Sequence, residues 1–514
     1  MNSVIISPVI IMQKQIIDIQ NDYKKWLLLN SNPNENIDLS DTYNKEVIIK
    51  GWVREFRAQS ENAFISLHDG STTESLQIFC TQSAITNFNE LENIRGASIE
   101  VIGRIVKSPA KGQLIELVAS EIKVIGELED KKSILLVKNV QLETLRGYQH
   151  LRPRFRTYTY IYKIRSTLLK CIHNFFHANN FYNIDPNIIT TSDCEGAGEV
   201  FTITTLNANQ IYTNTIDEKI NQLNLTNSIK TDLYKNDFFQ KQAFLTVSSQ
   251  LQLEALALGL SRVYTLNPSF RAEKSKTKRH LGCFTHLEWE IAFINLDDLM
   301  NFSEGLIKYV VGRTLQDCAN EYLELDKFIS KGIIQKLNGF INCNFERITY
   351  DKAIELINEN RKKILKKFSK EMTIKDIPSW GDDLGSFSER YICEEIYKKP
   401  TFVYDYPKDL KSFYMKLNDD GKTVSAVDLL IPYLGELIGS SIRESNYKKI
   451  CDAMDQRQMD KTKLEWYLDL RKNGGVTTGG AGLGFDRLVN MCTLMDGNIR
   501  DVVSFPVAYQ ECDY

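Results

Sequence analysis

The chain has 514 residues, which is too long for one ordinary hydrophobic core, so two or more domains are expected. Its hydrophobic fraction of 43% and charged fraction of 25% are typical of a soluble globular protein, and we expect no association with a membrane. The net charge of −3 argues against a general nucleic-acid coat, so any RNA must be bound by local clusters of cations.

The N-terminal region does not have the pattern of a targeting peptide. Val4–Ile11 is apolar, but it is short, contains Pro8 and has no basic leader, and no arginine precedes Arg54. We therefore expect a cytoplasmic protein, with an organellar location as the alternative. The ten cysteines form no Cys-x-x-Cys pair, so neither a disulfide framework nor a structural zinc site is expected.

Residues 1–46 are interpreted as an N-terminal extension and linker, with a short helix at 15–29. From residue 47 the pattern changes to short alternating strands separated by turn residues. Five such strands within residues 47–130 predict a small barrel of the OB type, a fold whose open face commonly binds single-stranded nucleic acid. The alternative is a β-domain without a binding role. The predicted strands are Val47–Arg54, Ala63–His68, Ser75–Cys80, Ser98–Val106 and Gln113–Val124.

Residues 131–156 are interpreted as a hinge, and residues 157–514 as a second, larger domain. Within it, Ile164–Asn179 places apolar residues on one face at helical spacing, and an extended stretch broken by Pro186 follows. The polar, Asn-rich segment at about 206–242 is typical of an inserted surface excursion. Residues 297–370 are predicted to be mainly amphipathic helix.

Two β-rich segments, Arg262–Phe270 and Cys283–Phe293, predict an antiparallel hairpin with a basic loop between them. Such a hairpin carries an arginine and a glutamate at its exit and a phenylalanine and a glutamate on its return. These groups could together bind a polyphosphate, an aromatic base and a small zwitterion, which indicates a site for ATP and an amino acid. The alternative is a solvated charged loop.

The hairpin sequence, FRAE at 270–273, RHL at 279–281 and FTHLE at 284–288, resembles motif 2 of the class II aminoacyl-tRNA synthetases for Asn, Asp and Lys. The Gly-rich run 479–488, interpreted as a loop before a helix, is similar to motif 3 of that family, and the helix and strand around Pro186 are similar to motif 1. The resemblance covers roughly residues 47–505. It implies an α+β fold, with an OB-type barrel followed by a catalytic domain built on an antiparallel sheet flanked by helices.

The resemblance also implies the residues that bind ATP and its magnesium ion. Asp428 and Glu436 fall on the metal positions, and two carboxylates suit Mg²⁺ held partly by nucleotide phosphates. The catalytic residues would be Arg271, Arg487 and Glu436. The complete predicted ATP-binding set is Arg271, Glu273, Arg279, His280, Leu281, Phe284, Glu436 and Arg487.

For the amino acid, the resemblance implies Glu195, Gln250, Glu288 and Arg443. The residue types favour asparagine over aspartate, because Arg443 with Glu288 makes a nearly neutral pocket that suits a carboxamide. The expected reaction is ATP-dependent ligation of L-asparagine to tRNA(Asn) through an adenylate. Three alternatives remain: the aspartate enzyme, a tRNA-independent amide-forming enzyme, and a catalytically dead RNA-binding relative.

In the barrel, the resemblance implies that Phe64 stacks on an anticodon base, that Gln77 bonds to one, and that Arg54 and Arg57 lie near the RNA backbone. Stacking requires that Phe64 is exposed. A homodimer through the motif 1 helix and strand around Pro186 is also expected. The sequence departs from the family pattern at Cys283, at Ala481 and in the C-terminal residues 507–514.

Overall fold

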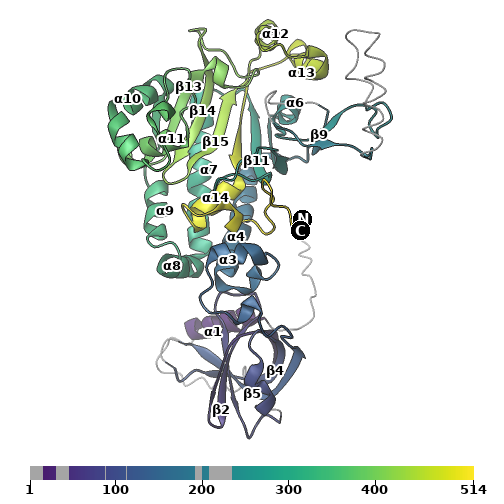
Figure 1. Ribbon diagram of the computed structural model, residues 1–514, viewed down its shortest axis with the longest axis vertical. Coiled ribbons are helices and arrows are strands. Elements are labelled where there is room, and N and C mark those ends of the chain that lie inside the picture. The colour runs from purple at the N-terminus through teal and green to yellow at the C-terminus, as the bar shows by residue number, and fades with distance from the viewer. Residues whose placement is uncertain are drawn as a thin grey trace. The chain divides into compact units, whose positions relative to one another are not determined.

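The computed structural model describes residues 15–29, 46–86, 88–110, 113–191, 199–207 and 234–513. The chain divides into two compact units, Met1–Tyr160 and Ile161–Tyr514 (Figure 1). The predicted boundaries at 46, 130 and 156 stay predictions, because compactness alone separates only these two units.

The first unit contains a closed five-stranded barrel with the strand order β1-β2-β3-β5-β4. The β3–β5 pair is parallel and the other pairs are antiparallel. Apolar side chains alternate with outward-facing ones, as in β2, where Ile65 and Leu67 are buried and Phe64 is not. All five predicted strands are therefore confirmed: β1 (Val47–Gln59), β2 (Asn62–His68), β3 (Leu76–Thr81), β4 (Ser98–Lys107) and β5 (Ile115–Gly126).

The predicted N-terminal helix is also present as α1 (Ile16–Leu29). Ile16 and Ile19 are buried in the core of the barrel unit. The first turn of α1 is capped by the loop after β2, because Ile16 N donates to Asp69 Oδ2 at 2.8 Å and Ile17 N donates to Ser71 Oγ at 3.2 Å. The helix is thus attached to the barrel at its N-terminal end.

The predicted hinge contains only short elements before a long helix. The helix α4 runs from Arg156 to Ala178, so it begins before the predicted start at Ile164. A 3₁₀ turn, η1 (Phe88–Asn93), lies between β3 and β4 of the barrel. The hinge elements are η2 (Ile134–Leu136), α3 (Leu142–Leu145), η3 (Arg146–Tyr148) and η4 (Arg152–Arg154).

An eight-stranded sheet forms the centre of the second unit, in the order β12-β13-β14-β15-β16-β11-β10-β6. Its pairs are antiparallel except at the two edges, where β12–β13 and β10–β6 are parallel. The predicted α+β class is therefore confirmed. The strands are β6 (Tyr182–Asn183), β10 (Arg262–Phe270), β11 (Cys283–Ala292), β12 (Glu346–Thr349), β13 (Thr401–Pro407), β14 (Thr423–Ile431), β15 (Gly435–Ile442) and β16 (Thr478–Gly484).

Helices pack on this sheet, with α10 against β13, α7 against β14 and α14 against β11 and β16 (Figure 1). The mainly helical prediction for 297–370 is confirmed, although it missed the edge strand β12. The longer helices are α6 (Gln250–Leu260), α7 (Leu296–Asp317), α8 (Ala319–Phe328), α9 (Ile333–Ile341), α10 (Tyr350–Lys367), α12 (Tyr447–Gln456), α13 (Glu465–Lys472) and α14 (Phe485–Thr493). The shorter ones are η6 (Ile374–Asp376), α11 (Ser386–Tyr391), the π-helical η7 (Ile392–Ile396), η8 (Lys408–Leu410), η9 (Lys461–Leu464) and η10 (Ile499–Asp501).

A second, three-stranded sheet has the order β7-β9-β8, formed by β7 (Ile189–Thr190), β9 (Ala243–Leu245) and β8 (Thr202–Ile203). Most of the predicted insertion at 206–242 lies outside the described residues. Among the helices that the structure describes, none combines the length and apolarity needed to cross a bilayer.

Candidate active site

The predicted hairpin is formed by β10 and β11, which pair from Arg262–Ile291 to Phe270–Cys283. The C-terminal part of the chain holds the basic loop that joins them. Gly282 N donates to Val507 O at 2.7 Å, and Ile499 N donates to Lys278 O at 2.9 Å. The residues after α14 therefore fix the loop, including the C-terminal stretch whose sequence departs from the family pattern.

This hairpin, the turn into β15 and the start of α14 surround a cavity of about 290 Å³. All eight residues that the sequence analysis assigned to ATP line this one cavity, although they come from segments more than 150 positions apart. The cavity also contacts His286, Gly482 and Gly484, which were not predicted. Its lining includes Arg271, Glu273, Arg279, His280, Leu281, Phe284, Glu436 and Arg487.

Cations gather in the cavity at the end formed by the loop and α14. Arg487 Nη1 donates to Glu436 O at 2.9 Å, and Arg279 Nη2 donates to Tyr433 O at 3.3 Å. Burial, followed by the nearby charge of Arg390, lowers the pKa of Arg279. Burial also lowers the pKa of His280. The charge of Glu273 opposes this lowering, and the charges of Arg487 and Arg271 add to it. The three arginines of the lining, Arg271, Arg279 and Arg487, offer positive charge and N–H donors to a polyphosphate.

The opposite wall offers a planar surface. The Arg271 guanidinium lies 5.7 Å from the ring centroid of Phe284, and both side chains are only partly buried. Leu281 is buried beside them. A flat aromatic ligand can stack on Phe284, while Arg271 remains close to any phosphate attached to that ligand.

The Gly-rich run predicted as a loop is instead the central strand β16, and that interpretation was wrong. Glycine is required there because the strand passes directly over side chains of β11 and α6. A Cβ at Gly480 would lie 1.8 Å from Glu290 Oε2, and one at Gly482 would lie 2.5 Å from His286 Nε2. The absence of a Cβ at Gly480 and Gly482 therefore makes room for the side chains of Glu290 and His286.

Asp428 and Glu436 lie on the β14–β15 hairpin, and both carboxylates are next to Gly439. A Cβ at Gly439 would be 3.1 Å from Glu436 Oε1 and 3.6 Å from Asp428 Oδ1. Lys411 Nζ neutralises Asp428 at 2.5 Å. Across the described residues, no group of three or more His, Cys, Asp or Glu side chains has the arrangement of a metal site. Two converging carboxylates fit a Mg²⁺ ion that takes its other ligands from phosphate and water.

A buried polar cluster adjoins the cavity through His286, and in this cluster Arg443 is paired with Glu290. Arg443 Nε and Nη2 donate to the two oxygens of Glu290 at 3.0 and 2.9 Å, and Nη1 donates to Ser441 Oγ at 2.5 Å. Gln250 Nε2 also donates to Glu290, at 2.5 Å. Burial by itself lowers the pKa of Arg443, but the charge of Glu290 outweighs burial, so the pKa is raised. The sequence reasoning combined Arg443 with Glu288 and missed Glu290.

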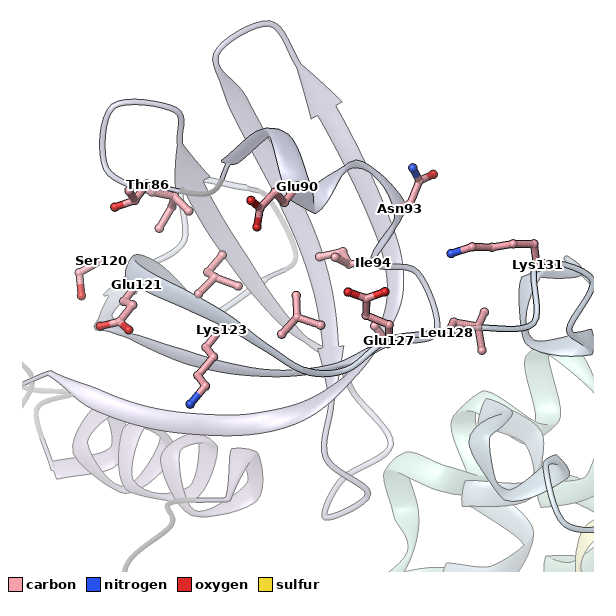
Figure 2. A pocket seen from close by; sticks show the side chains of 14 residues that line it. Thr86, Glu90, Asn93, Ile94, Ser120, Glu121, Lys123, Glu127, Leu128 and Lys131 are labelled. Carbon is pink, nitrogen blue, oxygen red and sulfur yellow. The ribbon is translucent and has the colours of Figure 1, made fainter.

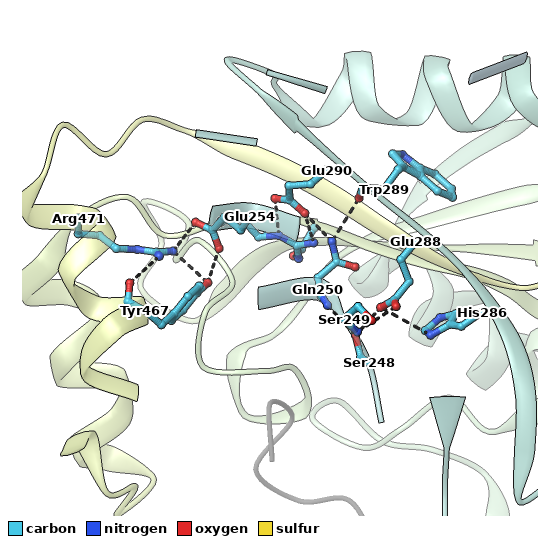
Figure 3. Close-up of polar contacts among 12 residues, drawn as sticks. Ser248, Ser249, Gln250, Glu254, His286, Glu288, Trp289, Glu290, Tyr467 and Arg471 are labelled. Carbon is cyan, nitrogen blue, oxygen red and sulfur yellow. Dashed lines mark hydrogen bonds and ion pairs between the residues drawn. The ribbon is translucent and has the colours of Figure 1, made fainter. Parts of the chain in front are cut away.

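Glu288 is fully buried and has different partners (Figure 3). Ser249 N donates to Glu288 Oε2 at 2.9 Å, Ser248 Oγ donates to Oε1, and His286 Nδ1 lies 3.6 Å from Oε1. Burial raises the pKa of Glu288 to about 6, against the lowering effects of these hydrogen bonds and of Arg271 and Arg443. Within the part of the chain that the structure describes, no arginine or lysine forms an ion pair with Glu288.

A second buried ion pair connects α6 to α13 (Figure 3). Arg471 Nη2 lies 2.6 Å from Glu254 Oε1, and the hydroxyl of Tyr467 donates to Glu254 Oε2. Glu254 is one helical turn after Gln250, so the pair fixes the helix that presents Gln250. Removing one member would leave a buried charge unpaired, which costs about 3–5 kcal/mol in folded proteins.

The structure places three of the four residues predicted for the amino acid in this cluster, namely Gln250, Glu288 and Arg443. The fourth, Glu195, lies outside the described residues. Glu290 follows Glu288 by two positions, and residues two apart on a strand share a face, so the sequence offers both glutamates as candidates without choosing between them.

On the barrel, the residues predicted for the anticodon lie on the outer side of β1, β2 and β3. Phe64 is partly exposed, so it meets the condition for stacking, and its ring centroid is 5.3 Å from that of Phe79. Arg57 is opposite Phe64 across the β1–β2 pair and forms an ion pair with Glu55. Gln77 Nε2 donates to Glu116 Oε2 at 3.1 Å. The anticodon role of these residues stays a prediction.

Two family models match the chain. The model described as class II tRNA synthetases (D, K and N) matches residues 141–509. The model described as an OB-fold nucleic acid binding domain matches residues 47–125. The chain is 41% identical over 465 residues to an asparagine–tRNA ligase of Borrelia garinii. The matched residues are 90% of this chain and 95% of the relative. It is 40% identical over 467 residues to one of Clostridium beijerinckii, with coverage of 91% and 95%.

Solved structures give the same result. The asparaginyl-tRNA synthetase of Pyrococcus horikoshii complexed with asparaginyl-adenylate matches with a TM-score of 0.75 and 30% identity, over 93% of this chain and 99% of that chain. The Entamoeba histolytica asparaginyl-tRNA synthetase in complex with asparaginyl-adenylate also has a TM-score of 0.75, with 26% identity over 91% and 97%. The aspartyl tRNA synthetase of the latter organism, at 17% identity, shares the fold.

Proposed function

Because the chain belongs to the asparagine–tRNA ligases, within the class II aminoacyl-tRNA synthetases, we propose that the cavity and the adjoining buried cluster form asparaginyl-adenylate. The enzyme ligates L-asparagine to tRNA(Asn) and releases AMP and diphosphate. The observation that carries the assignment of the site is that all eight residues predicted for ATP line one cavity, whose His286 is also 3.6 Å from Glu288 of the buried cluster.

In the first step, the carboxylate of asparagine attacks the α-phosphorus of ATP and diphosphate leaves. No protein nucleophile is required, because positioning and charge neutralisation are sufficient for phosphoryl chemistry. Arg271 supplies positive charge at the α-phosphate, and His280, Arg279 and Arg487 supply hydrogen bonds and charge toward the diphosphate. Phe284 stacks on adenine, with Glu273 and Leu281 at its edge. In the second step, a terminal hydroxyl of the tRNA attacks the adenylate carbonyl and AMP leaves.

Asp428 and Glu436 would hold Mg²⁺ in the ternary complex, and the ion would neutralise phosphate charge there. Two cations, Lys411 and Arg487, lie beside these carboxylates. Lys411, whose Nζ is 2.5 Å from Asp428 Oδ2, would share that carboxylate with the ion. Arg487 is 3.9 Å from Glu436 Oε2, so it brings its charge to the same end of the cavity.

Glu288 would select the carboxamide. The Arg443 contacts to Glu290 and Ser441 use three of its five N–H groups, so the others can donate to the side-chain oxygen of asparagine. Glu288 can accept from the amide NH₂. Aspartate would instead place a second carboxylate against Glu288, and an unpaired buried charge costs several kcal/mol.

The cytoplasmic location stays a prediction. The same holds for the homodimer, for which we propose the edge of the large sheet around Pro186. Tyr182, in β6 at that edge, is 58% exposed, and Ile189, in β7 at the edge of the three-stranded sheet, is 42% exposed. Apolar side chains at sheet edges favour association.

For the dimer, Ile189→Asp should shift the mass measured by light scattering from two chains toward one, because a charge would be buried in the interface. Ile374→Asp, at an exposed isoleucine of η6, should leave the mass unchanged. A parent protein that has the mass of one chain at micromolar concentration would refute the dimer.

For activation, Arg271→Ala should reduce asparagine-dependent ATP–diphosphate exchange by about 10²-fold or more, as the loss of a preorganised charge does. Arg361→Ala removes an exposed arginine of α10 and should retain the parent rate. Near-parent exchange by the folded Arg271→Ala protein would remove the basis for the catalytic assignment.

For the barrel, Phe64→Ala should lower kcat/KM for tRNA by a factor equivalent to roughly 1–3 kcal/mol, the contribution of one stacked base. Amino-acid activation should be unchanged. Phe328→Ala, at an exposed phenylalanine of α8, controls for loss of an aromatic ring. Equal losses of charging and of activation would show that Phe64 has only a structural role.

For specificity, Glu288→Gln keeps the shape of the pocket and removes its charge. The ratio of kcat/KM for asparagine to that for aspartate should fall by about one to two orders of magnitude, since 1.4 kcal/mol corresponds to roughly tenfold. Glu321→Gln, at a buried carboxylate of α8 paired with Lys163, should retain the parent ratio. An unchanged ratio in Glu288→Gln would show that Glu288 does not determine specificity.

A further inference from the structure

A lysine ammonium group lies against one of the two carboxylates proposed for Mg²⁺. Lys411 Nζ is 2.5 Å from Asp428 Oδ2 and 3.9 Å from the ring centroid of Tyr406. The side chains of Lys411 and Asp428 are only 18% and 9% exposed. A positive charge of the protein itself is therefore held, largely out of water, at the place where a metal ion is expected.

The position of Lys411 is fixed from a separate helix. Arg457, at the C-terminal end of α12, donates through Nη2 to Lys408 O at 2.8 Å and to Lys411 O at 3.1 Å. Burial by itself lowers the pKa of Lys411, but the charges of Asp428 and Glu436 outweigh burial, so the pKa is raised. Lys411 is thus a fixed, permanent charge and differs from a solvated surface lysine.

The other carboxylates at this end of the cavity also have cations beside them. Glu436 Oε2 is 3.9 Å from Arg487 Nη1. Glu389 Oε2 and Arg279 Nη1 each lie 3.2 Å from the position that a Cβ would take at Gly435, so these two groups are close to one another. With Lys411 beside Asp428, each of these carboxylates has a cation near it. A divalent cation that arrives without a nucleotide therefore meets no excess of negative charge.

A nucleotide changes this balance. Its phosphates would add several negative charges beside Arg279 and Arg487, which line the cavity. The added charge attracts Mg²⁺, which prefers to take some of its ligands from phosphate and water. Lys411 meanwhile reduces the repulsion between the phosphates and Asp428. The same ammonium group therefore favours the nucleotide and disfavours a free cation.

Exposed carboxylates of the barrel unit lie in a different environment. A cavity of about 620 Å³ is lined there by exposed charged side chains, among them Glu90, Glu121, Glu127, Lys123 and Lys131 (Figure 2). Water and salt screen such charges, so these carboxylates can bind divalent cations only weakly, and equally in every variant of the second unit. A single lysine has a much larger effect in a buried ion pair such as that of Lys411 with Asp428.

We propose that Lys411 is a positioning residue that keeps free divalent cations away from Asp428 and Glu436 until a nucleotide binds. Lys411 is not among the residues that line the cavity, so it acts through Asp428. The inference rests on the proposed function and adds an order to it. The metal ion enters with the nucleotide or after it, and it does not bind before.

Lys411→Gln tests this in the full-length protein, because glutamine keeps a hydrogen-bond donor for Asp428 and removes the charge. Without nucleotide, the affinity for Mn²⁺, measured from the electron paramagnetic resonance of the free ion, should rise about tenfold or more. With all divalent cations chelated, the Kd for α,β-methylene-ATP should instead rise about fivefold. A merely structural role of Lys411 would weaken the binding of both ligands, so the opposite signs identify the charge.

Three variants serve as controls. Lys411→Arg keeps the charge and should bind both ligands as the parent does. Lys163→Gln removes a lysine that is 2.7 Å from the buried Glu321, and it should also bind as the parent does. Adding Asp428→Asn to Lys411→Gln should abolish the gained Mn²⁺ affinity, which locates that affinity at Asp428.

The parent protein gives a test that does not depend on the folding of any variant. Without nucleotide, it should bind Mn²⁺ no more tightly than exposed carboxylates do. A parent site with a micromolar Kd for Mn²⁺ alone would overturn the proposal. So would a Lys411→Gln protein whose Mn²⁺ affinity equals that of the parent or falls below it, and in either case the ligase function stands. Failure of the parent to activate asparagine would overturn the proposed function, while Mn²⁺ binding, which requires no turnover, still reports separately on Lys411.

Discussion

The pairing of Arg443 with Glu290 is the interaction on which the catalytic unit depends. Both side chains are almost completely buried, and a buried ion pair is tolerated only if its remaining hydrogen-bonding groups find partners. Ser441 and Gln250 supply those partners from β15 and α6. The pair therefore restricts the sequence of three neighbouring elements, and it also requires that β16 has no side chain at Gly480.

The same pairing determines the electrostatics of the amino-acid pocket. Because Glu290 takes the nearest cation, Glu288 is left with the hydroxyl and backbone N–H of the segment before α6 and with His286. A carboxylate held by neutral donors can accept from a carboxamide but repels a carboxylate. His286 also lines the cavity proposed for ATP, so it connects the two halves of the proposed site. On the proposed function, the selectivity between asparagine and aspartate arises from which of the two glutamates pairs with the arginine.

Much of the fold and of the candidate site could be predicted from the sequence, because its local patterns follow one another in the order typical of the family. Alternation of apolar residues was enough to define the barrel strands and to place Phe64 outside. The resemblance of the hairpin and of the Gly-rich run to the motifs of the family identified residues from distant segments, and these residues line one cavity. The partner of Arg443 could not be predicted, because Glu288 and Glu290 share a strand face and the choice depends on the register of β11 against β16. The Gly-rich run was misread as a loop because glycine is usually a turn signal, whereas here close packing of side chains from a neighbouring strand requires it.

The pH dependence of amino-acid discrimination tests this account most directly. The carboxylate of free aspartate stays ionised between pH 5 and 8, since its pKa is about 3.9. Burial raises the pKa of Glu288 to about 6, so the repulsive form is complete above that pH and is lost as the pH falls through it. The asparagine-to-aspartate ratio of kcat/KM in diphosphate exchange should therefore be constant above about pH 7 and decline by up to roughly tenfold at pH 5. A ratio that stays constant from pH 5 to 8 in the parent enzyme would contradict the role assigned to Glu288.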